Sequence, residues 1–353
     1  MGPSSTHEPA MSARTSAGGG PLLGLALGAG AMRGLAHIGV LEALLDAGIR
    51  PQVVAGTSAG SLVGALYAAG VEPPAMMQAA PDLLAQVRRE MRLSPWGVLV
   101  LGSRLTLHAL RRATPSAPQG MAAGNRLESW LRTHVPVRDF GEMRLPFAAV
   151  ACDLHSGEAV LLTRRAWLRG PLPPRTVVLE EVPPAAALRA SCSIPWLYTP
   201  KRLAGRALID GGTVEPVPAR VCRLLGAEVV VAVDLGTGHR QDGDVHALPR
   251  VVDRAAAILL QRLTDLQLER HADVVVRPNL TPPADGAPPL ESWVRAGYEA
   301  ASACLDAIRR SLARAAAMAS RTESGAVPPT LRRAHSAAST SRHRTASAAN
   351  SGL

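Results

Sequence analysis

Aromatic side chains are scarce in this chain: two Phe, three Tyr and five Trp make up 3% of its 353 residues. Because 47% of the residues are nevertheless hydrophobic, Ala, Val and Leu must fill most of the core, which burial of aliphatic area must then stabilise. The scarcity also argues against a nucleic-acid-binding protein, which stacks bases on aromatic rings. The formal net charge of +10 rests on scattered arginines, so weak attraction to anionic lipid headgroups explains it better.

Cysteine pairs are missing too. Four cysteines lie far apart and form no CxxC pair: Cys152, Cys192, Cys222 and Cys304. This spacing argues against a zinc site and against a disulfide framework, so no metal or cofactor is expected. Small buried thiols in a reducing cytosol are the simplest interpretation, and a cytoplasmic location is expected from it.

A hydrophobic run fit to cross a membrane is not evident either. The uncharged segment from Val53 to Val71 comes nearest, but it contains four glycines, one threonine and two serines. A lipid-facing helix is a poor interpretation of such a segment, whereas a buried strand, a turn and a helix explain it. Attachment to a membrane surface stays open.

One globular region is expected between two low-complexity ends. Residues 1–20 are rich in Ser, Gly, Thr and Pro and predict a disordered leader. Residues 320–353 are rich in Ser, Ala, Thr and Arg and predict a disordered basic tail, for which simple solvation is favoured over a role in membrane binding. The domain between them covers residues 21–319.

Within this domain, short apolar runs alternate with segments of helical periodicity. Strands are expected at Leu22–Leu27, Val53–Ala55, Phe147–Ala151, Ala207–Ile209 and Val229–Val233, and helices at Leu35–Ala47, Ala59–Ala69, Val251–Gln267 and Ser292–Met318. Such alternation predicts an α/β fold with a mostly parallel sheet and helices on both faces. For Pro73–Gln119, two helices capping the sheet are favoured over a mobile lid that touches lipid.

The strongest motif is a G-x-S-x-G sequence, Gly56-Thr57-Ser58-Ala59-Gly60. An apolar strand precedes it and a helix follows it, which is the context of a nucleophile elbow. Such a turn strains the serine backbone and lifts the hydroxyl away from the sheet, while the helix N-terminus favours developing negative charge. Ser58 is therefore the candidate nucleophile.

A glycine-rich loop lies between the first strand and the first helix, with the sequence Gly28-Ala29-Gly30-Ala31-Met32-Arg33-Gly34. A dinucleotide fingerprint is excluded, because Arg33 stands where the third glycine belongs and no acidic residue ends the next strand. The loop instead suggests backbone N–H groups that form an oxyanion hole. It lies on the βα unit before Ser58, so both turns should share one edge of the sheet.

A third motif, Asp210-Gly211-Gly212, follows the apolar run Ala207–Ile209. Parallel α/β sheets place active sites at the carboxyl ends of their strands, although Asp-Gly is also a common turn pair. No histidine after Asp210 ends a strand before a glycine turn: His239, His246, His271, His335 and His343. His37 is expected to be a packed residue. The sequence therefore favours a Ser58–Asp210 dyad over a triad.

Taken together, these motifs resemble the patatin-like phospholipases, especially the bacterial members and the neuropathy-target-esterase-like lysophospholipases. The resemblance runs from Leu22 to about Met318. It rests on the three motifs and on three further segments: Ala36-His37-Ile38-Gly39-Val40-Leu41, Ala151-Cys152-Asp153-Leu154 with Gly157, and Ala190-Ser191-Cys192-Ser193-Ile194-Pro195. A three-layer patatin-like fold is implied.

The resemblance also implies the roles of the site residues. Ser58 would be the nucleophile, Asp210 the base, and the motif glycines Gly56, Gly60, Gly211 and Gly212 would shape the turns. The oxyanion hole would come from backbone N–H groups around Gly28, Gly30, Ala31, Arg33, Gly34 and Ala59. Many members have glycines in place of Ala29 and Ala31. Alanine keeps its backbone N–H, so the oxyanion hole can form as long as the loop needs no positive φ at these positions.

The implied activity is hydrolysis of fatty-acyl esters in a phospholipid or lysophospholipid, without metal or cofactor. An acyltransferase using the same two residues stays open, because the sequence cannot separate the two activities. A non-catalytic regulator at a membrane is the third alternative, against which the intact Ser58 and Asp210 argue.

Overall fold

A computed structural model describes residues 20–91, 120–236, 248–280 and 290–323. Its centre is a nine-stranded sheet in which seven strands follow the order β5-β4-β3-β2-β1-β8-β9, while β7 pairs with β3 and with β6. The strands are β1 Leu23–Leu27, β2 Val53–Thr57, β3 Phe147–Asp153, β4 Ala159–Leu162, β5 Thr176–Leu179, β6 Lys201–Leu203, β7 Arg206–Asp210, β8 Val229–Val233 and β9 Val274–Val276. The expected leader and tail lie outside the described residues, except for residues 20 and 320–323.

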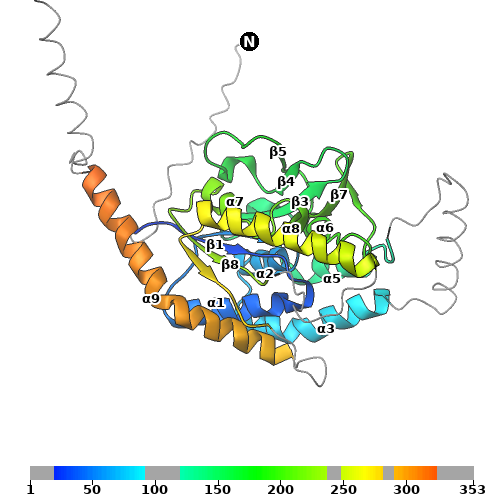
Figure 1. The fold of residues 1–353 in the computed structure, drawn as a ribbon, viewed down its shortest axis with the longest axis horizontal. Coiled ribbons are helices and arrows are strands. Elements are labelled where there is room, and N and C mark those ends of the chain that lie inside the picture. The colour runs from blue at the N-terminus through cyan, green and yellow to red at the C-terminus, as the bar shows by residue number, and fades with distance from the viewer. Residues whose placement is uncertain (1–19, 92–119, 237–247, 281–289, 324–353) are drawn as a thin grey trace, which may run out of the picture.

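Helices cover both faces of this sheet, which makes three layers (Figure 1). The α-helices are α1 Ala36–Asp46, α2 Ala59–Ala68, α3 Pro73–Met91, α5 Asn125–His134, α6 Pro184–Ser191, α7 Ala219–Leu224, α8 Leu248–His271 and α9 Leu290–Glu323. Short 3-10 helices occupy η1 Ala31–Leu35, η2 Phe140–Glu142, η3 Arg165–Trp167 and η4 Gly211–Thr213. Among the described residues, no helix is both long enough and apolar enough to span a bilayer.

Two hydrophobic clusters lie on opposite faces of the sheet because successive side chains of a strand alternate between faces. Leu23, Leu25 and Leu27 of β1 pack in the cluster formed with α1, α2 and α9, whereas Ala26 packs in the cluster formed with α7 and α8. All five residues of β1 are buried, as are those of β2 and β8. Aliphatic side chains dominate both clusters, as the composition predicts.

The sheet is mostly parallel, as predicted, but β4, β5 and β7 run in the opposite direction to β3. Asp210 ends β7, which runs antiparallel to β3 and pairs with it from Asp153 to Ala151. The sequence argument placed Asp210 at the end of a parallel strand, and that part was wrong. The strands β3 and β7 lie far apart in the chain, so no local periodicity reveals that they pair.

The C-terminal helix α9 lies directly against α1 (Figure 1). A Cβ atom on Gly39 of α1 would lie 1.8 Å from the carbonyl oxygen of Val294, and one on Gly297 of α9 would lie 1.9 Å from that of Ala36. The two backbones therefore touch at two glycines, with no side chain between them. Gly39 belongs to a segment that the resemblance singled out, and this contact explains why the position needs a glycine.

The predicted strands and helices all occur, and their ends differ from the predicted ones by at most five residues. In the segment Pro73–Gln119, α3 confirms one helix and the rest lies outside the described residues. The sequence analysis missed β4, β5, β6 and β9, and the helices α5, α6 and α7. All seven have ten residues or fewer, which leaves little room for a periodic signal.

Candidate active site

Ser58 stands at a sharp turn between β2 and α2. Its backbone has φ 53° and ψ −124°, a conformation that non-glycine residues rarely adopt. Gly60 permits the turn, because a Cβ atom there would lie 2.1 Å from the carbonyl oxygen of Leu27. At Gly56, a Cβ atom would lie 2.4 Å from the carbonyl oxygen of Gly60. The elbow geometry predicted from the sequence is therefore present, with both flanking glycines in close backbone contact.

Asp210 reaches the same place because two strands meet head-on beside β3. Thr57, the last residue of β2, pairs with Val150, and Asp210, the last residue of β7, pairs with Ala151. Since β2 runs parallel to β3 and β7 antiparallel to it, both strands end at neighbouring positions of β3. Ser58 follows Thr57 directly, so the register itself brings residues 58 and 210 together.

The carboxyl group of Asp210 is buried, and burial raises its pKa to about 6, while the Ser58 hydroxyl and the N–H of Gly212 oppose this shift. Its Oδ1 atom accepts the N–H of Gly212 at 2.8 Å. Its Oδ2 atom makes no hydrogen bond among the described residues. Ser58 is thus close enough to stabilise the charged carboxylate without a formed hydrogen bond, and catalytic contacts of this kind often tighten only when substrate binds.

A pH dependence follows from this environment. A base must be deprotonated, so kcat/KM for an ester substrate should rise as the pH passes through about 6 and then reach a plateau. Because the folded pKa of Asp210 lies above its ordinary value of 3.8, the contribution of this carboxyl to stability should fall as the pH rises from about 4 to about 6, and Asp210→Asn should remove that contribution. Rate profiles and urea unfolding at several pH values measure both effects. An inflection that disappears in His271→Asn instead would favour a histidine base.

Ser191 holds the elbow in place, a role that the sequence analysis missed. The N–H of Ser58 donates to the Ser191 hydroxyl oxygen at 3.0 Å, and that hydroxyl donates to the carbonyl oxygen of Val150 at 2.6 Å. Ser191 is fully buried at the end of α6, so no water replaces this link. Its place in a segment shared with the family was the only signal in the sequence.

Ser191→Ala should therefore lower kcat about tenfold with little change in KM, because a buried N–H at the nucleophile loses its acceptor. Thr163→Val is the matched control, since the buried Thr163 hydroxyl also donates to a β3 carbonyl, that of Phe147 at 2.6 Å. Both variants should be less stable, but only Ser191→Ala should be slower. Equal kcat values for the two variants would show that Ser191 has no positioning role.

The glycine-rich loop faces the same turn, and hydrogen bonds sort its candidate donors. The N–H of Gly28 donates to the carbonyl oxygen of Val233, and that of Arg33 donates to Gly30. Because the N–H groups of Gly28 and Arg33 already donate to carbonyl oxygens, they are not available to an oxyanion. Gly30 donates no backbone hydrogen bond to a described residue, and Ala31 and Ala59 each begin a helix, where N–H groups lack partners within the helix.

Two other members of the loop have packing roles. A Cβ atom on Gly34 would lie 2.4 Å from the Cβ of Ala59, so the loop rests on the helix that starts at the elbow. The Arg33 side chain donates to the carbonyl oxygens of Leu235 and Gly236 at 2.7 and 3.0 Å. Ala31 does adopt a positive φ of 48°, so this chain tolerates there the strain that a glycine would avoid.

His37 lies under the loop as a packed residue, as expected. Its Nε2 atom contacts the carbonyl oxygen of Gly28 at 2.8 Å, and burial lowers its pKa to about 4. The ring is therefore neutral near pH 7 and supports the loop.

His239 and His246 lie outside the described residues, as do His335 and His343. No group of three or more described His, Cys, Asp or Glu side chains could hold a metal ion.

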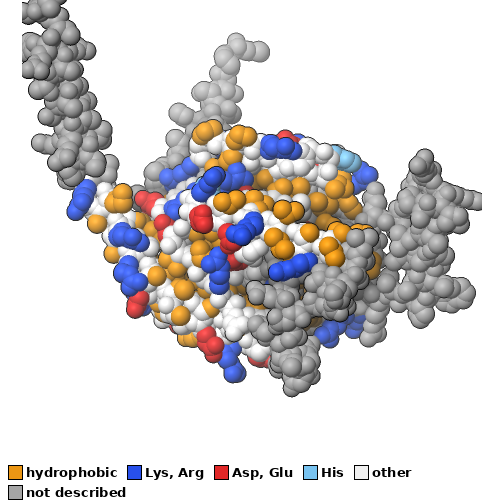
Figure 2. Space-filling view, in the orientation of Figure 1, with side chains coloured by type: hydrophobic (Ala, Val, Ile, Leu, Met, Phe, Trp, Pro, Cys, Tyr) orange, Lys and Arg blue, Asp and Glu red, His pale blue; other side chains and the backbone are white. Residues whose placement is uncertain are grey.

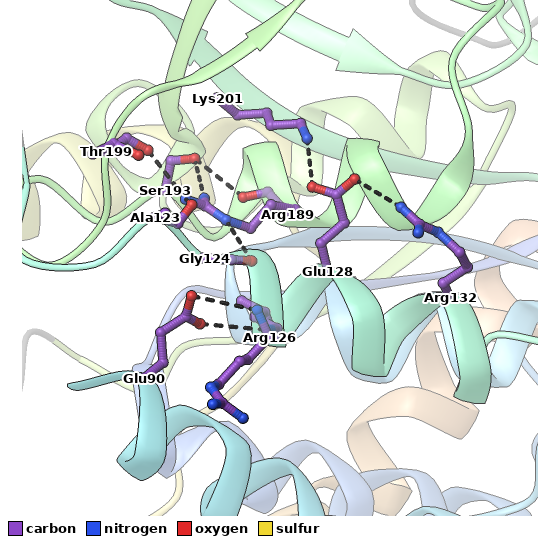
Figure 3. A network of polar contacts seen from close by, with 11 residues as sticks. Glu90, Ala123, Gly124, Arg126, Glu128, Arg132, Arg189, Ser193, Thr199 and Lys201 are labelled. Atoms are coloured by element: carbon purple, nitrogen blue, oxygen red, sulfur yellow. Dashed lines mark hydrogen bonds and ion pairs between the residues drawn. The ribbon is translucent and has the colours of Figure 1, made fainter. Parts of the chain in front are cut away.

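A buried arginine, Arg189, holds together several chain segments by hydrogen bonds (Figure 3). Arg189 donates to the carbonyl oxygens of Ala123, Gly124 and Thr199 and to the Ser193 hydroxyl, at 2.7 to 3.2 Å. The carbonyl of Ser193 in turn accepts the N–H of Asp210 at 3.0 Å. Because its partners are neutral, burial lowers the pKa of Arg189.

The same network fixes α5 beside this arginine. The carboxylate of Glu90 accepts the N–H groups of Arg126 and Leu127 in the first turn of α5, and Glu128 contacts both Lys201 and Arg132 (Figure 3). In this way α3, α5, α6 and β6 hold the surroundings of the Ser193–Asp210 contact.

Comparison with known proteins decides the family. The model of the patatin-like phospholipases matches residues 25–223, more than half of the chain, and this range contains Ser58, Asp210 and the glycine-rich loop. The chain belongs to the patatin-like phospholipase family.

This patatin-like chain is similar to an uncharacterized NTE family protein of Mycobacterium tuberculosis, with 32% identity over 216 residues, 61% of this chain and 49% of that protein. It is also similar to the lysophospholipase NTE1 of Coccidioides immitis, with 30% identity over 218 residues, 62% of this chain and 12% of that protein. The chain thus spans about half the length of the mycobacterial relative. Among solved structures, VipD from Legionella pneumophila aligns with a TM-score of 0.42 and 14% identity over 82% of this chain and 67% of that one.

Proposed function

We propose that this protein is a serine hydrolase that cleaves fatty-acyl esters of lipids, with Ser58 as nucleophile and Asp210 as base. The observation that carries the proposal is the head-on meeting of β2 and β7 beside β3, in which Thr57, the residue before Ser58, and Asp210 pair with the adjacent residues Val150 and Ala151. The strained backbone of Ser58 and the raised pKa of Asp210 support it, since both are typical of catalytic groups. The activity is assigned to residues 21–319.

The proposed reaction has two steps. Asp210 takes the proton of the Ser58 hydroxyl while Oγ attacks the ester carbonyl carbon. The resulting oxyanion accepts hydrogen bonds from the backbone N–H groups of Gly30, Ala31 and Ala59. The bond to the alcohol then breaks, the alcohol leaves with the proton from Asp210, and an acyl-serine remains. Asp210 next takes a proton from water, whose oxygen attacks the acyl carbonyl carbon. The bond to Oγ then breaks, Asp210 returns the proton to Oγ, and the fatty acid leaves with the Ser58 hydroxyl restored.

Phospholipids or lysophospholipids are the proposed substrates. One relative is named a lysophospholipase, and the matched family is that of the patatin-like phospholipases. The chain covers 12% of that relative, so the proposal extends to this chain only the chemistry of the shared segment.

A lipid panel tests the proposal. Purified wild type and Ser58→Ala should be incubated with phosphatidylcholine, lysophosphatidylcholine and a monoacylglycerol, and the released fatty acid measured. Activity of wild type alone, with a fluorophosphonate attached to Ser58, would support hydrolysis. If the acyl group passes to added lysolipid or glycerol in preference to water, the protein is an acyltransferase. If neither turnover nor labelling occurs, the proposal fails.

A further inference from the structure

The outward face of α8 carries large apolar side chains. Five large aliphatic side chains of this helix are exposed, and we call them the α8 stripe: Val251, Val252, Ile258, Leu259 and Leu266. Leu259 is 71% exposed and Val252 60%. Figure 2 shows hydrophobic side chains gathered along the helix, with basic side chains beside them.

Helical geometry puts the stripe on one side. At 3.6 residues per turn, positions 252, 259 and 266 fall on one line along the axis, and 251 and 258 form a parallel line beside it. The buried residues Ala257, Thr264 and Leu268 face the protein. The five exposed aliphatic side chains therefore form a contiguous apolar surface, and such surfaces mark contacts with partners or membranes.

Charge around the stripe favours an anionic partner. Among the described side chains of α8, Arg262 and Arg270 are exposed and Arg254 is half-buried, against one exposed carboxylate, Glu269. The carboxylate of Asp265 is met by Arg277 at 3.3 Å. The whole chain has a formal net charge of +10. Two copies of such a chain repel each other, whereas an anionic surface attracts it.

The stripe is also connected to the candidate active site. Gln267 of α8 donates to the carbonyl oxygen of Val214 at 3.0 Å, and Val214 directly follows the Asp210–Thr213 turn. Outside the stripe, the apolar side chain of Trp196 is 84% exposed. Trp196 lies three residues after Ser193, whose carbonyl oxygen accepts a hydrogen bond from the N–H of Asp210. Apolar exposure thus occurs in two segments that contact the surroundings of Asp210.

We infer that the α8 stripe docks on the surface of an anionic phospholipid bilayer, with the aliphatic side chains among the acyl chains and the arginines at the headgroups. The choice of a lipid partner rests on the proposed function, and the place rests on α8 itself. Docking there would hold the surroundings of Asp210 at the layer from which a lipid ester must be drawn.

Vesicle co-sedimentation tests this inference. Wild-type protein should bind vesicles of phosphatidylcholine with phosphatidylglycerol, and more weakly at high salt or without phosphatidylglycerol. The triple variant Val252→Gln, Leu259→Gln, Leu266→Gln should bind these vesicles at least about tenfold more weakly. Met318→Gln, also 71% exposed but on α9, is the matched control and should bind as wild type does.

The outcomes separate the docking surface from the chemistry. With a soluble short-chain ester the triple variant should retain wild-type kcat, whereas hydrolysis of vesicle lipid should fall with binding. A wild type that binds vesicles but hydrolyses no ester would refute the proposed function and leave the docking surface supported. Equal vesicle binding by wild type and the triple variant would overturn the inference. So would a wild-type dimer that the triple variant converts to monomers while neither binds vesicles.

Discussion

Ser58→Ala and Asp210→Asn should each lower kcat/KM toward a soluble short-chain ester by at least about 1,000-fold. Ser58→Ala removes the proposed nucleophile, and Asp210→Asn removes the proposed base. Because the two groups act in one step, the double variant should be no slower than the slower single variant. Release of a chromogenic alcohol from the ester measures these rates.

Matched controls exclude an effect of the substitution itself. Ser129→Ala changes an exposed serine on α5, and Asp306→Asn changes a carboxylate that is 81% exposed on α9. Both should retain wild-type rates. Circular dichroism should show that all four variants are folded. Near-normal turnover by Ser58→Ala or Asp210→Asn would remove the dyad from consideration.

Gly39→Ala should lower the free energy of unfolding by about 3 kcal/mol, because the added methyl group forces α1 and α9 apart. A Cβ atom at this position would lie 1.8 Å from a backbone oxygen, which cannot move without the helix. In an open helix the same change would stabilise by about 1 kcal/mol, so even the sign of the effect reports the contact. Urea unfolding followed by circular dichroism measures it.

Gly64→Ala on α2 provides the comparison. Its Cβ would meet only side-chain atoms, of Val54 at 3.0 Å and of Phe147 at 3.1 Å, and these can shift. We expect a smaller loss than for Gly39→Ala. If the two variants are equally stable, the α1–α9 contact is looser than the structure indicates.

The sequence could predict those parts of the fold that depend on local patterns. The run Val229–Val233 is buried on both sides and has the predicted bounds, and the glycines around Ser58 stand where the backbone must approach closely. Ser58 was identifiable because strand, turn and helix follow one another in the chain.

Long-range pairing limited the rest of the prediction. The antiparallel pairing of β7 with β3 joins residues more than 50 positions apart, and the hydrogen bond from Ser58 to Ser191 joins residues 133 positions apart. Neither leaves a periodic trace. The helix at α8 was predicted, but an apolar face in a sequence is normally taken to point inward. Only the structure shows that five of its large aliphatic side chains point outward.

The order of strands has a consequence for exchanging segments between relatives. The family match ends at residue 223, yet β8, which follows it, pairs with every residue of β1. A chimera cut at that boundary would need a foreign β8 to fit the row Leu23–Leu27, and one without a substitute would leave this apolar row open to other chains. Aggregation on loss of the C-terminal third is therefore the expected behaviour, even though both residues of the proposed dyad would still be present.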